Sequence, residues 1–285
     1  MVYNYQNSHS GSFIKSFLAP YKLKSVIVCF FLLCFQHLHA QKKIDSVYNW
    51  GISIGANAGR ATVIDKNFSS LPFYGNYLGL KYALFNQGAK FTHLIEISYK
   101  SDTLKNKYSN KVAESLLNLD YTSLFHLKPR NLSNAIKVYV GGSLNGVYAT
   151  RNYTGFVNNN DSYESILSLS AACKIKYSPK GKLAGFSISD DIRVPLASSI
   201  GQPSFGSESP TGSTHVLADK SLFKNHKIGS FGDYLRAINS ITVEKTLKKR
   251  QRVALLYTID YYHVKTERDV RQLIQGAELI YSYLF

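Results

Sequence analysis

Aspartate and histidine side chains between residues 190 and 263 are the groups in this sequence that could support hydrolysis, because a carboxylate beside an imidazole can orient and activate water. The candidates are Asp190, Asp191, His215, Asp219, His226, Asp233 and His263. Their spacing is irregular, and no Asp-x-Asp or Asp-x-His pair occurs among them. A His-Glu-x-x-His motif and a phosphate-binding loop are also missing. The spacing therefore argues against an enzyme, and we expect no cofactor and no metal site.

A second set of ionisable residues alternates with apolar residues. Because alternate side chains of a β-strand share one face, this set is predicted to face the interior of a closed sheet. Its members are Glu96, Asp120, Glu164, Lys174, Lys176, Asp191, Arg193, Glu244, Asp260 and Glu278. Both signs of charge are present, which leaves two interpretations open. The favoured one is a salt-bridged interior that stabilises the fold, since buried charges are normally paired. The other is a narrow polar path for small ions or solutes.

The elements that position these charges are predicted strands. Within 117–127, for example, Leu117, Leu119 and Tyr121 alternate with Asn118 and Asp120. About ten such segments recur, at 50–58, 72–85, 89–101, 115–128, 134–150, 163–177, 182–196, 231–247, 251–265 and 271–285. The connections between them are alternately short and long; the longest, at 197–230, is rich in Ser, Gly, Pro and Thr in its first half. This pattern predicts an all-β fold, a transmembrane antiparallel up-and-down β-barrel with short periplasmic turns and long extracellular loops. A soluble β-sandwich is the alternative.

The N-terminal region carries the features of an export signal. Ten apolar residues, 26–35, follow three lysines and precede Leu38-His39-Ala40. Because about 20 residues are needed to span a bilayer, we predict a signal peptide over 1–40 rather than an anchor. A short periplasmic segment, 41–49, and a barrel, 50–285, would follow.

The composition sets two further limits. The chain has 45% hydrophobic residues, which excludes wholesale disorder. Of its three cysteines, Cys173 alone lies outside the predicted signal peptide, which excludes an intrachain disulfide.

The last strand carries the most specific motif. Tyr281, Tyr283 and Phe285 stand at alternate positions and end the chain. This arrangement resembles the terminal signal that the barrel-assembly machinery reads in outer-membrane proteins. The Ala40–Gln41 junction and the Tyr-rich strands are similar to small porin-like barrels of the Bacteroidota, a PorT-like group with members in type IX secretion.

The resemblance implies a non-enzymatic outer-membrane barrel, either a narrow porin-like protein or a surface-binding protein. An accessory subunit of an envelope secretion or assembly machine is the alternative that it leaves open. A rim hydrolase of the omptin type is less favoured, because the Asp and His pairs of that family are not found here.

Basic residues gather beside the predicted short turns, and the windows 85–90, 128–137, 174–182 and 245–252 contain no Asp or Glu. The predicted periplasmic rim consists of Lys128, Arg130, Lys137, Lys180, Lys182, Lys248, Lys249, Arg250 and Arg252. It would meet the anionic head groups of outer-membrane lipid. Alternatively, it would dock an acidic periplasmic partner or a cell-wall polymer, because a patch of one sign attracts the opposite charge. No nucleic-acid partner is expected.

Overall fold

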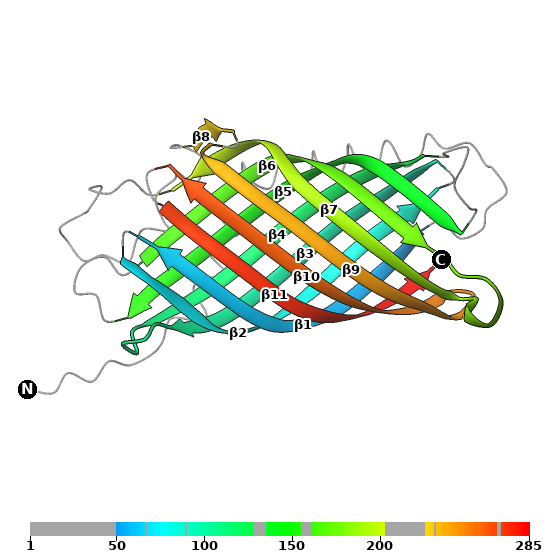
Figure 1. The fold of residues 1–285 in the computed structure, drawn as a ribbon, viewed down its shortest axis with the longest axis horizontal. Coiled ribbons are helices and arrows are strands. Elements are labelled where there is room, and N and C mark those ends of the chain that lie inside the picture. Colours follow the sequence, from blue (N-terminus) through cyan, green and yellow to red (C-terminus); the bar gives the residue numbers. More distant parts are fainter. Residues whose placement is uncertain are drawn as a thin grey trace, which may run out of the picture. The chain divides into compact units, whose positions relative to one another are not determined.

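A computed structural model shows that the chain forms a single antiparallel sheet (Figure 1). The structure describes residues 50–66, 68–88, 90–127, 135–154, 161–202, 226–230, 232–266 and 269–285. Its strands are β1 (Trp50–Asp65), β2 (Ser69–Gln87), β3 (Phe91–Lys105), β4 (Lys111–Leu127), β5 (Ile136–Thr154), β6 (Asp161–Tyr177), β7 (Phe186–Gly201), β8 (His226–Gly229), β9 (Tyr234–Lys248), β10 (Gln251–Lys265) and β11 (Asp269–Leu284). The helix among these residues, η1 (Gly181–Leu183), is a single short turn. No helix in these ranges is long and apolar enough to cross a membrane.

The sheet closes on itself because its first and last strands pair. β1 and β11 are antiparallel partners from Gly51 opposite Leu284 to Asp65 opposite Val270. On the other side of the circuit β6 pairs with β7, and β7 pairs with β9. The short β8 adds only to the end of β7. Ten strands therefore form a closed up-and-down barrel, as the sequence predicted.

The strands are longer than the apolar alternation indicated. The predicted segments left long loops near 59–71 and 102–114, and the structure shows that this prediction is wrong. Only residues 66–68 separate β1 from β2, and only 106–110 separate β3 from β4. The outward side chains become polar there, as at Arg60, while the inward ones, such as Val63, remain buried. Backbone pairing of β1 continues to Asp65, because inward side chains such as Val63 still pack into the buried core. The connection between β7 and β9 is still the longest, although β8 lies within it.

The outer face of the barrel is apolar over most of its height. Leu80, Leu119, Leu169, Leu255 and Leu279 are between 44% and 65% exposed, and each lies on a different strand. Their neighbours along each strand point inward, because successive side chains alternate between faces. A band of exposed aliphatic and aromatic side chains around a closed sheet is the surface of a transmembrane barrel.

The buried core lies inside the barrel, near the end where β1 leads into β2. It includes Val63, Phe73, Leu104, Val112 and Tyr153. These residues stand close to the ends of their strands, so the apolar core fills the lumen at this end, which we call the loop end. The opposite end, which we call the turn end, holds both termini of the barrel: the Phe285 backbone N–H donates to the Trp50 carbonyl.

Candidate functional site

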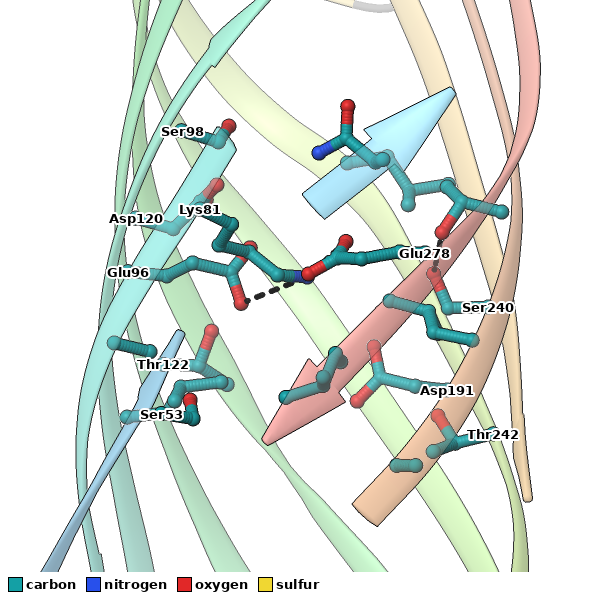
Figure 2. A pocket seen from close by; sticks show the side chains of 18 of the residues that line it. Ser53, Lys81, Glu96, Ser98, Asp120, Thr122, Asp191, Ser240, Thr242 and Glu278 are labelled. Atoms are coloured by element: carbon teal, nitrogen blue, oxygen red, sulfur yellow. Dashed lines mark hydrogen bonds and ion pairs between the residues drawn. The ribbon is translucent and has the colours of Figure 1, made fainter. Parts of the chain in front are cut away.

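A polar chamber occupies the lumen from its middle toward the turn end. Its volume is about 240 Å³. The lining reaches Gln87, which is the last residue of β2, and Ser282 near the end of β11. Side chains from opposite walls point into the same space; Glu96 comes from β3, and Asp191 comes from β7 (Figure 2). The inward positions of many strands thus supply one shared surface, in which charged and hydroxyl side chains are mixed with apolar ones such as Leu94, Leu256 and Ile280.

Lys81 crosses the middle of the chamber and joins two carboxylates. Its Nζ lies 2.7 Å from Glu278 Oε2 and 3.6 Å from Glu96 Oε2 (Figure 2). The three residues stand on β2, β11 and β3, which are not all neighbours in the sheet. The lysine therefore links the lumen walls through charge, and it narrows the chamber at this height.

Two arginines organise the opposite wall. Arg193 Nε donates to Asp191 Oδ1 at 2.8 Å, and its Nη1 lies 3.9 Å from Asp120 Oδ1. Arg236 forms a bidentate pair with Asp260, at 2.9 Å for Nε–Oδ1 and 2.6 Å for Nη2–Oδ2. Parallel bonds of this kind are stronger than single neutral hydrogen bonds. Arg236 also donates to the Asn145 side chain.

The turn-end mouth of the chamber is ionic as well. Glu244 Oε1 lies 3.2 Å from Lys176 Nζ and 3.6 Å from Arg252 Nη1. Lys174 lines the chamber and has no carboxylate within ion-pair distance among the described residues. Lys100 places its Nζ 5.2 Å from the centre of the Tyr77 ring. The chamber therefore presents both signs of charge, with lysines still able to meet an anion.

The loop end is closed by a buried ion cluster around Arg151, whose side chain is fully enclosed. Its Nε donates to Glu114 at 2.6 Å, and its Nη1 donates to Glu164 at 2.8 Å. Its Nη2 donates to Tyr262 Oη at 2.5 Å and to Gln272 Oε1 at 3.2 Å. Most of the guanidinium donors are therefore satisfied, as a buried charge requires. We call this cluster, with the apolar core packed around it, the plug.

The structure brings the predicted lumen charges into one interior. Eight of them line the chamber: Glu96, Asp120, Lys174, Asp191, Arg193, Glu244, Asp260 and Glu278. Lys176 joins them through Glu244, whereas Glu164 belongs to the plug. Ile95 on β3 and Leu119 and Tyr121 on β4 alternate with these charges, so they lie on the outer face.

Sequence reasoning missed Lys81, Lys100, Arg151 and Arg236. Arg236 lies on the same face of its strand as Glu244, and Lys100 lies on the same face as Glu96. The alternation of apolar and polar residues could therefore have predicted both. Arg151 was assigned to a loop near 151–162, but β5 extends through Thr154.

The described residues of the predicted basic rim lie at the turn end. Lys137, Lys180, Lys182, Lys248, Lys249 and Arg250 are exposed, whereas Arg252 is half-buried beside Glu244. Lys128 and Arg130 fall outside the described residues. At the end of β11, Tyr281 and Phe285 are 46% and 54% exposed on the outer face, with Tyr283 between them.

The hydrolase candidates do not converge within the described residues. Asp190 and Asp191 are sequence neighbours on one strand and point to opposite faces. His226 Nδ1 lies 2.9 Å from Ser199 Oγ, and His263 Nε2 lies 2.9 Å from Asp269 Oδ1 on another part of the loop end. His215 and Asp219 lie outside the described residues. The described residues also hold no cluster of His, Cys, Asp and Glu suited to a metal.

Residues 51–55 match the Gly-x-Ser-x-Gly pattern of some hydrolases, with Ser53 at the serine position. The pattern activates serine on a sharp strand-to-helix turn. Here it lies within the continuous strand β1, where Ser53 pairs with Ala83 and Ser282. The match therefore reflects a Gly-rich strand, and Ser53 is not on the turn that would make it a nucleophile.

No protein-family model matches the chain, and no curated protein matches its sequence. Similar solved structures are barrels of the outer membrane. The outer membrane protease OmpT from Escherichia coli is 7% identical with a TM-score of 0.48, over 85% of this chain and 99% of that chain. The translocator domain of the autotransporter NalP from Neisseria meningitidis is 8% identical with a TM-score of 0.41, over 92% and 96%. The P. putida toluene transporter TodX is 8% identical with a TM-score of 0.34, over 84% and 91%. Because these identities and TM-scores are low, the assignment of the fold rests on this chain's own strand pairing.

Proposed function

We propose that the chain is an integral outer-membrane barrel of the narrow porin-like kind, which admits small polar solutes or ions to its lumen from the turn end. The observation that carries this proposal is the polar chamber of about 240 Å³ inside a barrel whose outer face is apolar. A barrel that served only as a scaffold could fill its lumen with paired charges and apolar side chains throughout. This one leaves an open volume of about 240 Å³ between the paired charges of the chamber.

The plug supplies the barrier in this proposal. Tyr234 and Tyr262 are 1% and 2% exposed, and their ring centres lie 6.4 Å apart. Both belong to the buried core of the plug, and Tyr262 accepts a hydrogen bond from Arg151. Passage across the membrane therefore requires the plug to open, and the resting conductance is expected to be very low.

Planar-bilayer recordings test this function. We expect the wild-type barrel to give rare, small openings, and the double variant Tyr234→Ala, Tyr262→Ala to raise the conductance severalfold, because it removes two rings from the plug. The matched control is Tyr257→Ala, Tyr261→Ala, since these side chains belong to the outer face of β10. If the plug variant passes no more current than the control, the lumen is not a route for ions. If the wild type already conducts as freely as the plug variant, the plug is not the barrier.

The basic rim is proposed to hold the barrel at the anionic head groups of the periplasmic leaflet. Lys and Arg near an anionic surface contribute about 1 kcal/mol each. Changing Lys248, Lys249 and Arg250 together to Gln is expected to leave assembly intact and to weaken binding to anionic vesicles at low salt. Arg252 is left in place because it contacts Glu244. Loss of a salt-sensitive co-purifying protein from the variant would instead favour docking of an acidic partner.

A further inference from the structure

A polar pair interrupts the lipid-facing band between β7 and β9. Asn239 Nδ2 donates to Asp190 Oδ1 at 2.7 Å. Asp190 pairs with Ile175 on one side and Ile241 on the other, which are 49% and 46% exposed. Asn239 likewise pairs with Ile192 and Ile259, at 47% and 37% exposed. A carboxylate and an amide therefore lie on the outer face, surrounded by isoleucines that would contact hydrocarbon.

An ionisable side chain facing lipid is costly, so it is rare unless another polar group meets it. Asp190 has no cation within ion-pair distance among the described residues, and its second carboxylate oxygen has no hydrogen-bond donor there. One N–H of the Asn239 amide is used by Asp190, which leaves its second N–H to donate. The pair thus offers one acceptor and one donor side by side on an apolar surface.

A donor and an acceptor side by side are complementary to a second copy of the same surface. A two-fold axis along the membrane normal brings β7 of one copy opposite β9 of the other. Asp190 of each copy then faces Asn239 of its partner, and two identical hydrogen bonds form. Ile188, Ile192 and Ile241, which are 46–47% exposed, would pack around them.

We propose that the β7–β9 face, centred on Asp190 and Asn239, is the interface of a homodimer within the membrane. The partner is a second copy of this chain in the same orientation. The polar pair selects that partner, because a purely apolar partner would leave the second carboxylate oxygen of Asp190 without a donor. The lumen of each copy is not part of the contact, so the proposal stands independently of conduction.

Oligomeric state in lipid vesicles, measured by single-molecule photobleaching over a range of protein-to-lipid ratios, tests the proposal. We expect the wild-type barrel to dimerise, and Asp190→Leu and Asn239→Leu each to raise the dimer dissociation constant roughly ten-fold or more. The matched control is His93→Leu, which removes another polar group from the outer face on β3, where it contacts Tyr121. Each variant is checked for the folded band that shifts on heating, and Asp190→Leu should fold readily because it removes a charge from lipid.

Disulfide cross-linking locates the contact. With Cys173 changed to Ser, Ile192→Cys is expected to give a cross-linked dimer under mild oxidation, since it lies beside Asn239 near the two-fold axis. Ile97→Cys on β3 is the control that should not cross-link.

A wild-type barrel that stays monomeric at every protein-to-lipid ratio would overturn the proposal and would leave the face to lipid or to another envelope protein. A dimer that survives both leucine substitutions would also overturn it.

Discussion

Replacing Arg151 with Met is expected to destabilise the barrel by about 3–5 kcal/mol, because it leaves two buried carboxylates without their cation. Glu114 and Glu164 both contact this guanidinium, and both are almost fully buried. Urea unfolding in lipid vesicles measures the loss. Trp50 is the single tryptophan of the chain and reports on the transition by fluorescence.

The triple variant Arg151→Met, Glu114→Gln, Glu164→Gln separates charge from packing. Removing a whole buried ion cluster is often neutral, whereas removing one member is not. We therefore expect the triple variant to recover most of the stability that the single variant loses. Equal losses in the two variants would show that the plug depends on the shape of the arginine and not on the neutralisation of the glutamates.

Introducing Arg at Leu119 is expected to cost about 2–4 kcal/mol, because this side chain is 44% exposed in the apolar band. The matched substitution one residue later, Asp120→Asn, should cost much less. Asp120 faces the chamber, where Asn145 and Arg193 contact it, and an amide keeps its shape. Unfolding in vesicles compares the two variants. If Leu119→Arg assembles normally while Asp120→Asn does not, the faces of β4 are exchanged, as a register slip of one residue would produce.

The faces of the strands were predictable because the side-chain period of a strand is two. Glu96 and Asp120, which the sequence assigned to the same interior, are direct cross-strand partners in the structure. The positions of strand ends were less predictable. Near Arg60 the outer face turns polar, so the alternation fades although the backbone pairing continues.

The plug could not be predicted from a local pattern. Arg151 on β5 meets Tyr262 and Gln272 on strands far away in the sequence, so the contacts depend on closure of the barrel. The alternation that places Asp191 in the lumen also places Asp190 on the outer face. Its contact with Asn239 could not be predicted from a local pattern, because it depends on the pairing of β7 with β9.

Spin-label accessibility along β11, in a lipid bilayer, tests the central claim most directly. Nitroxides at Leu279, Ile280, Tyr281 and Ser282 alternate between the apolar outer face and the lining of the chamber. A membrane-spanning barrel with a polar chamber predicts collisions with dissolved oxygen at 279 and 281, and collisions with a water-soluble nickel chelate at 280 and 282. Uniform access of the nickel chelate to all these positions, or the opposite alternation, would contradict this account.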